Sequence, residues 1–409
     1  MLVIVKIKSI VIILFLANNL ISQKQFFLID STNLSSPTNL AYLQDVYYLN
    51  NQLWARFDEW NVNGNDVFLV SPKKYFKFST RDSNILMGPS NLFGTDLGFI
   101  IPKYNREKIM FFDTINGQLI IDKSFNHQKI SSKTIVPFVN EVAGYNAFTN
   151  LRTDISYTYP FLLFNCITWT YDENSKKIST LKRSIKRIFK KNKSFLLFDI
   201  QKKKVINTFG KYPSIYLKEY NNVVNMNHYF VTDEKSKITY SSYQADENIT
   251  IYAINGDIIG LIKAPGKLVN KERLSLSIFN REVVKRKILY NSFCDSYENV
   301  YLFNDKLFRI YNLALPVDSL ANWLPETSSP RCIPYQTEIE WLNIILTKPR
   351  YLQQISLDGK EIYEFPFPTG VNTFVGYDSK QQIYYFRKQK LGIGNIPQGS
   401  TIIYAFKLE

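Results

Sequence analysis

The stretch Ile109–Phe125 reads IMFFDTINGQLIIDKSF. Two β-prone runs flank Asn116-Gly117, a dipeptide that readily adopts the positive φ angles of a tight hairpin turn. Units with the same rhythm of apolar strand, polar turn and second strand are found in Phe195–Phe209, Ile249–Pro265, Val300–Pro316 and Tyr351–Pro368. Alternation within each strand predicts that one face of each hairpin packs against a neighbouring unit.

The turns of these units recur at intervals of roughly 50 residues, with one interval of about 85. They are Asn63-Gly64, Asn116-Gly117, Gln201-Lys202, Asn255-Gly256, Asn304-Asp305 and Asp358-Gly359. A period of this length with several strands per unit is typical of a β-propeller. We therefore predict an all-β fold, a six-bladed β-propeller. A large β-sandwich or two stacked domains are the alternatives.

The strand-like segments of the sequence predict the residue range of each blade. The first four blades are expected around 45–70, 97–125, 160–209 and 228–263, the fifth at 287–313 and the sixth at 337–366. Gln25–Asp30 is predicted to complete the last blade together with 382–387 and 401–408, because such a closure removes the open edge of the ring.

The longer interval places an insertion in the third blade. Its apolar residues Leu181, Ile185, Ile188 and Phe189 recur at helical spacing. The other face of the predicted helix is basic and contains Lys182, Arg183, Lys186, Arg187, Lys190 and Lys191. This pattern predicts a short basic amphipathic helix. Such a helix either contacts an anionic surface or caps the third blade with its apolar stripe.

The N-terminus reads as an export signal. Lys6 and Lys8 precede the apolar run Ile10–Ala17, which is shorter than the ~20 residues of a membrane-spanning helix. We expect residues 1–22 to be a signal peptide and 23–409 one propeller domain, with an uncleaved anchor as the alternative. No cysteine follows the apolar run, so we expect an exported protein, periplasmic or extracellular, that is not a lipoprotein. The charge of the basic insertion would also suit nucleic acid, but export makes nucleic acid a poor partner.

The inventory of reactive side chains restricts the chemistry. Histidine occurs only at His127 and His228, which argues against a histidine-based triad or a multi-histidine metal site. The cysteines are Cys166, Cys294 and Cys332, and the sequence leaves open whether the last two pair. No motif for a cofactor, a phosphate loop or a catalytic nucleophile stands out. We predict no cofactor, no metal ligand and no catalytic residue.

Four residues are candidates for ligand binding because they lie near the expected starts of blades. They are His228, Tyr229, Asp154 and Asp295. In a propeller these positions lie close to the mouth of the central channel. A structural role for His228 is the alternative. Acidic residues near blade starts could also hold a calcium ion, which prefers oxygen ligands, but they do not recur at one fixed place in each unit.

The chain resembles the uncharacterised six-bladed, TolB-like propeller proteins that many bacteria export. The resemblance rests on the export signal, the six hairpins and Met87-Gly88-Pro89-Ser90-Asn91. This stretch is similar to a Gly-Pro-Asn-Gly-like loop between early blades of that family, although Ser90 interrupts the pattern. The resemblance implies a propeller fold outside the cytoplasm and implies no reaction.

These observations favour a non-catalytic binding or scaffolding module. The expected ligand is a protein, a peptide or a glycan at the channel mouth or on one face of the ring, and we expect a monomer. One alternative is a calcium-dependent propeller hydrolase or lyase. The other is a surface-associated protein docked by the basic insertion.

Overall fold

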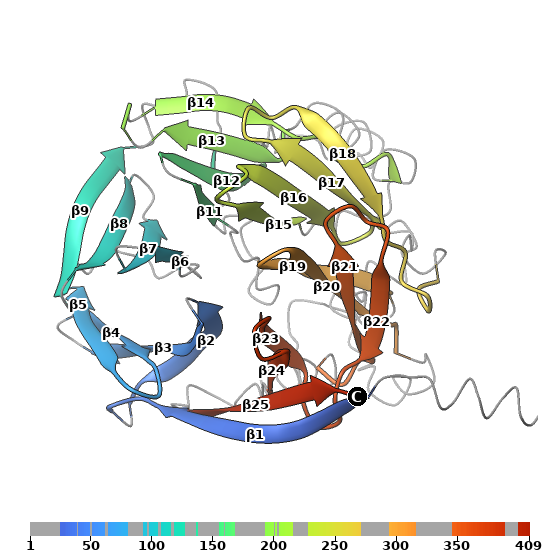
Figure 1. Cartoon of the computed structure of the whole chain (residues 1–409). Helices are drawn as coiled ribbons and strands as arrows, with labels where there is room; N and C mark the ends of the chain where they lie inside the picture. The colour runs from blue at the N-terminus through green and yellow to red at the C-terminus, as the bar shows by residue number, and fades with distance from the viewer. Residues whose placement is uncertain are drawn as a thin grey trace, which may run out of the picture.

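The computed structural model is all-β, and its sheets stand around a central axis in the arrangement of a β-propeller (Figure 1). The prediction of an all-β propeller is therefore confirmed. The structure describes residues 25–38, 40–49, 51–61, 64–80, 93–95, 98–104, 108–115, 118–126, 136–137, 155–158, 160–167, 193–199, 201–202, 204–215, 228–270, 294–315, 346–388 and 400–409.

Within these residues the strands pair into six antiparallel sheets. The first three in chain order come from the N-terminal half. One contains β2 (Tyr42–Leu49), β3 (Gln52–Asn61), β4 (Gly64–Val70) and β5 (Tyr75–Thr80). The next contains β6 (Phe93–Thr95), β7 (Gly98–Tyr104), β8 (Lys108–Ile115) and β9 (Gln118–Asn126). The third contains β10 (Val136–Pro137), β11 (Ile155–Thr158), β12 (Phe161–Ile167), β13 (Phe195–Asp199) and β14 (Lys204–Phe209).

The other three sheets complete the arrangement. One contains β15 (His228–Asp233), β16 (Ile238–Tyr243), β17 (Asn248–Ala253) and β18 (Ile258–Lys263). The next contains β19 (Ser296–Phe303), β20 (Lys306–Asn312), β21 (Arg350–Ser356) and β22 (Ile362–Pro366). The last, here called the closing sheet, contains β23 (Thr373–Asp378), β24 (Ile383–Arg387), β25 (Ser400–Leu408) and β1 (Phe26–Ser35).

The closing sheet joins the two ends of the described chain. Strand β1 lies at its edge and pairs antiparallel with β25, from Phe26 opposite Leu408 to Ser35 opposite Ser400. The backbones of Gln25 and Glu409 exchange two hydrogen bonds of 3.1 and 3.2 Å beyond this ladder. The predicted pairing of the N-terminal strand with the C-terminal tail is therefore confirmed.

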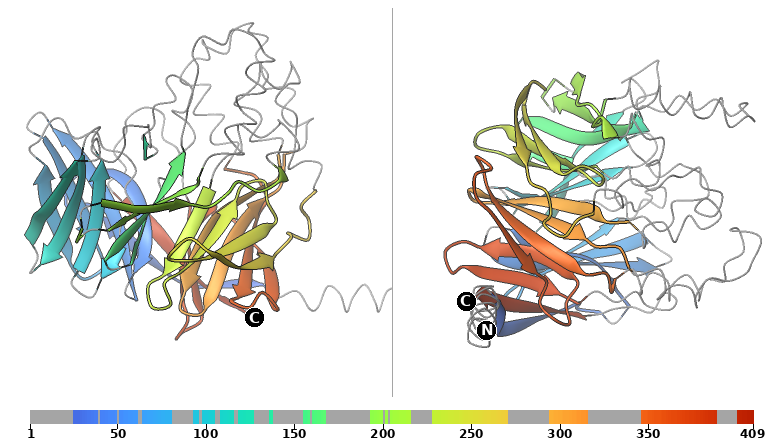
Figure 2. Two further views of the ribbon diagram at one scale, coloured as in Figure 1. Left: turned by 90° about the horizontal axis from the view of Figure 1, so that it is seen from above. Right: turned by 90° about the vertical axis from the view of Figure 1, so that its right-hand side faces the viewer.

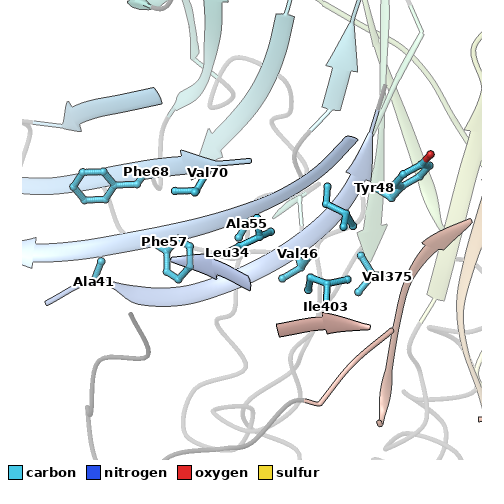
Figure 3. Packing of buried hydrophobic residues seen from close by; sticks show 11 residues of the cluster. Leu34, Ala41, Val46, Tyr48, Ala55, Phe57, Phe68, Val70, Val375 and Ile403 are labelled. Carbon is cyan, nitrogen blue, oxygen red and sulfur yellow. The ribbon is translucent and has the colours of Figure 1, made fainter. Parts of the chain in front are cut away.

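Apolar side chains fill the spaces between neighbouring sheets. Figure 3 shows Val46 and Ala55 of the β2–β5 sheet facing Val375 and Ile403 of the closing sheet. On the other side of the closing sheet, Phe308, Ile310 and Leu352 pack against an aromatic cluster that includes Phe374, Tyr384 and Phe386. Burial of each such side chain stabilises the fold by roughly 1.5–3 kcal/mol. The closing sheet therefore shares an apolar core with the neighbouring sheet on each side of it.

The two faces of the ring differ in the lengths of their connections. Short turns join first to second and third to fourth strands, and two of them lie side by side, because the amide of Asn304 donates to Ser379 Oγ. We call this side the short-turn face. The opposite side carries the connections from β12 to β13, β18 to β19 and β20 to β21, which are much longer. We call it the long-connection face. Figure 2 shows the sheets standing between these two faces.

The assignment of hairpins to blades needs a correction. Val300–Pro316 and Tyr351–Pro368 were expected in successive blades, but β19–β20 and β21–β22 are two hairpins of a single sheet. The last sheet is instead formed by the C-terminal tail and β1. The four strands predicted between residues 228 and 263 are confirmed in one sheet. The predicted signal peptide and the six basic residues of the predicted helix lie outside the described residues.

Candidate functional site

The structure places two of the four predicted binding residues in the protein interior. His228 begins β15 and is buried, with Nε2 2.7 Å from Ser241 Oγ and its ring stacked on Tyr243 at 4.4 Å. Phe195 of the adjacent sheet contacts the same ring edge-on at 4.6 Å. Burial lowers the pKa of His228 to about 3, so the imidazole is neutral at physiological pH. His228 therefore serves the packing between two sheets.

Asp295 also has a structural role. Its carboxylate lies just before β19, is 1% exposed and accepts backbone hydrogen bonds from Asn270 at 2.6 Å and Ala314 at 2.7 Å. It thereby holds the segment that leaves β18 and the segment that leaves the β19–β20 hairpin. Tyr229 is half-buried and packs against a cluster between the β15–β18 and β19–β22 sheets. Asp154 lies outside the described residues, so its predicted role is untested.

A cavity of about 440 Å³ opens between the β19–β22 sheet and the closing sheet. We call it the interblade pocket. It lies at the long-connection face, where β21 begins, β22 ends and β24 ends. Its lining consists of Leu346, Thr347, Lys348, Pro349, Arg350, Tyr351, Pro366, Phe367, Pro368, Thr369, Gly370, Val371, Asn372 and Lys388.

One wall of the interblade pocket is the connection from β22 to β23. The Phe367 amide donates to the Arg350 carbonyl at 2.9 Å, and the Asn372 amide donates to the Arg387 carbonyl at 3.1 Å. These bonds attach the connection to both sheets. Between them, Gly370 has a φ of +87°, a left-handed conformation that glycine adopts without a steric penalty. The wall is therefore held in place by the backbone itself.

Among the described residues that line the interblade pocket, three have cationic side chains and none is acidic. Arg350 Nη1 donates to the Asn372 carbonyl at 2.6 Å. Lys348 Nζ donates to the Cys294 carbonyl at 2.8 Å, and burial lowers the pKa of this amine to about 8 despite the nearby Glu298 carboxylate. Lys388 is exposed. The electrostatic potential of this lining favours a negatively charged ligand.

Two buried polar atoms next to the interblade pocket lack hydrogen-bond partners within the described part of the chain. They are Arg350 Nε and Asn312 Oδ1, on residues that lie directly opposite each other in β21 and β20. A buried polar group without a partner costs roughly 1–3 kcal/mol.

The residues of the interblade pocket do not form a motif that stands out in the sequence. Lys348 and Arg350 stand on either side of Pro349, and the opposite wall contains Pro366, Pro368 and Gly370. Such proline-bounded cationic segments are a weak signal on their own, because the pocket forms only when two sheets meet.

Other features of the described residues bear on the predicted alternatives. No group of three or more His, Cys, Asp or Glu side chains in the described ranges is arranged to hold a metal ion. Cys294 is buried, and its possible partner Cys332 lies outside the described residues. In the part of the chain that the structure covers, no helix has the length and apolar character needed to span a membrane.

Comparisons with known proteins agree with the fold. No protein-family model and no curated protein matches the chain. A crystal structure of a member of the DUF4221 family from Bacteroides vulgatus is similar, with a TM-score of 0.60 and 11% identity over 95% of this chain and 99% of that chain. A protein of unknown function from Bacteroides thetaiotaomicron (TM-score 0.41, 9% identity, 93% and 77% covered) and the WD40 domain of Toxoplasma gondii coronin (0.40, 7%, 95% and 88%) are more distant. At 11% identity, the similarity to the DUF4221 member shows the fold alone.

Proposed function

We propose that the chain from about residue 23 is a six-bladed, TolB-like propeller that acts outside the cytoplasm as a monomeric, non-catalytic binding module. Its ligand occupies the interblade pocket. The six described sheets and the ladder between β1 and β25 support the complete ring. The export signal predicted from Lys6, Lys8 and Ile10–Ala17 supports the location.

The interblade pocket is the observation that carries this proposal. Its volume of about 440 Å³ is within the range of roughly 300–1,000 Å³ that is usual for small-molecule sites. It lies on rigid sheets, and the connection that forms its wall is attached to both of them, so the pocket exists before any ligand arrives. His228 and Asp295 have buried, hydrogen-bonded side chains and do not line this pocket.

Blocking the pocket tests the proposal. Thr369 is exposed in the pocket wall, so Thr369→Trp should fill the pocket without disturbing the core. Gln381→Trp, in the exposed turn between β23 and β24 on the short-turn face, is the matched control. The probes are benzoate, benzamide, D-glucuronate and D-glucose, observed by saturation-transfer NMR.

We expect at least one probe to bind the unmodified protein, to lose its signal with Thr369→Trp and to keep it with Gln381→Trp. The proposal is overturned if no probe binds, or if the probes that bind are unaffected by Thr369→Trp.

A further inference from the structure

The composition of the interblade pocket indicates the class of its ligand; this inference rests on the proposed function of the same pocket. We propose that the ligand is a small organic carboxylate, whose charged group binds Arg350 and Lys388 and whose body lies against the apolar wall. The first reason is charge. Lys348, Arg350 and Lys388 contribute to the lining, and the part of the lining that the structure describes contains no Asp or Glu side chain.

The three cations differ in what they can offer a ligand. Lys348 is buried, bonded to the Cys294 carbonyl and close to Asp295 and Glu298, so its charge is already balanced by its own surroundings. Arg350 makes one side-chain hydrogen bond among the described residues, through Nη1 to Asn372. Lys388 is exposed at the rim. Arg350 and Lys388 are therefore the groups that remain for a ligand.

Arg350 is suited to a carboxylate. A guanidinium carries five N–H donors in a planar fork that matches the two oxygens of a carboxylate. Its Nε is buried and has no hydrogen-bond partner in the described structure. A carboxylate that docks on the guanidinium forms charge-assisted hydrogen bonds, which are roughly twice as strong as neutral ones.

Most of the rest of the lining is apolar and therefore favours an anion that carries an apolar organic group, here called its organic body. Tyr351, Phe367 and Val371 line the same cavity, together with Pro349, Pro366 and Pro368. An inorganic ion would leave this apolar surface in contact with water. A ring or a short hydrocarbon chain would bury part of it, which is favourable by roughly 25 cal/mol per Å². A cavity of about 440 Å³ also holds more than a single small ion.

Matched probes and matched variants test the assignment. Isothermal titration calorimetry compares benzoate with benzamide and D-glucuronate with D-glucose, because each pair differs mainly in the carboxylate. Inorganic phosphate serves as the anion without an organic body. The variants are Arg350→Gln and Lys388→Gln in the pocket. Lys380→Gln is the control, because Lys380 is exposed in the turn before β24 while Lys388 follows the end of the same strand.

We expect the acid of at least one pair to bind at least tenfold more tightly than its neutral partner. Arg350→Gln should weaken that binding at least tenfold and Lys388→Gln about two- to fivefold, whereas Lys380→Gln should leave it unchanged. If Arg350→Gln does not fold, Lys388→Gln decides alone, because Lys388 is exposed and its loss leaves the core intact.

The outcomes separate this inference from the proposed function. Equal binding of acid and neutral probes, or binding insensitive to Arg350→Gln and Lys388→Gln, overturns the carboxylate assignment while the pocket stays a binding site. Phosphate binding as tight as that of the organic acid also overturns it. Absence of binding by every probe overturns both proposals.

Discussion

His228 illustrates how a polar residue can stabilise a propeller without contacting a ligand. Its ring lies between Phe195 and Tyr243, and Ser241 is its hydrogen-bond partner. The folded protein keeps this imidazole neutral down to a pKa of about 3, whereas an unfolded chain protonates it near pH 6.5. Below pH 6.5 the unfolded state binds a proton that the folded state does not, so stability falls as the pH falls.

We therefore expect the stabilisation due to His228 to be complete above pH 7 and to decrease by roughly 2 kcal/mol between pH 7 and pH 4.5. His228→Gln removes this titration. The measurement is urea unfolding of both proteins at the two pH values. A stability difference between them that does not change with pH would contradict the neutral, buried histidine.

Arg309 is the most completely buried charged side chain in the described core. Its Nε donates to Gln353 Oε1 at 2.9 Å, its Nη2 donates to the carbonyls of Glu247 and Ala264, and its guanidinium lies 4.1 Å from the centre of the Tyr297 ring. These contacts tie the β19–β22 sheet to the segment that leaves β18. Removal of the guanidinium would leave several buried acceptors without a donor.

Arg309→Met should accordingly lower the free energy of unfolding by about 2–4 kcal/mol. Lys306→Met, at the start of the same strand, should change it by less than about 0.5 kcal/mol. Chemical denaturation compares the two. Equal effects of both substitutions would show that the buried contacts of Arg309 do not stabilise the fold.

At the scale of the strand and the turn, the hairpin β17–β18 shows why local sequence predicts this fold well. Asn255-Gly256 forms its turn, and Gly256 has a φ of +94°. A Cβ at Gly256 would also lie 2.5 Å from the ring of Phe209 in the neighbouring sheet. The glycine therefore serves both the turn and the contact between sheets.

Gly256→Ala should destabilise the fold through both backbone strain and a steric clash, whereas Gly370→Ala should introduce the backbone strain alone. Both positions have positive φ, but no atom lies within 4 Å of a Cβ built at Gly370. We expect about 1 kcal/mol of destabilisation from backbone strain at Gly370 and about 1–3 kcal/mol more at Gly256 from the clash. Thermal unfolding of the two variants measures the difference. Equal losses would mean that Phe209 does not pack against the turn.

Turn sequences also explain why two hairpins of one sheet were predicted to belong to successive blades. Asn304-Asp305 and Asp358-Gly359 both turn at the short-turn face, one between the first two strands of a sheet and the other between the last two. The long connection from β20 to β21 separates them by about one repeat, so they resemble successive units. A hairpin sequence specifies its own turn but does not specify which pair of strands in a four-stranded sheet it joins.

The candidate site was less predictable than the strands. The positions of His228 and Asp295 near the starts of first strands were foreseen, but their burial depends on side chains from other segments, such as Phe195 and Tyr243. Arg350 and Lys388 are 38 positions apart and line one pocket only because two sheets meet there. Neither residue belongs to a local motif that carries this information.

At the scale of the molecule, the account depends on a ring that is closed by its own ends. Strand β1 begins directly after the predicted signal peptide and pairs with the last strand of the chain. This pairing covers the edge of β25, which would otherwise be open to other chains. It also brings the β2–β5 sheet, which follows β1, against the closing sheet, where Leu34 and Ile403 share a cluster with Val46 (Figure 3).

A disulfide across β1 and β25 tests this closure most directly. Asn33 and Ile402 are paired in the ladder and both are exposed, so Asn33→Cys/Ile402→Cys should cross-link under mild oxidation and raise the Tm. Asn33→Cys/Lys407→Cys places the second cysteine about 17 Å away along β25 and should not cross-link. Mass spectrometry of the folded, oxidised proteins identifies the linked peptides. Failure of the first pair to cross-link, or equal cross-linking of both pairs, would contradict the closed ring.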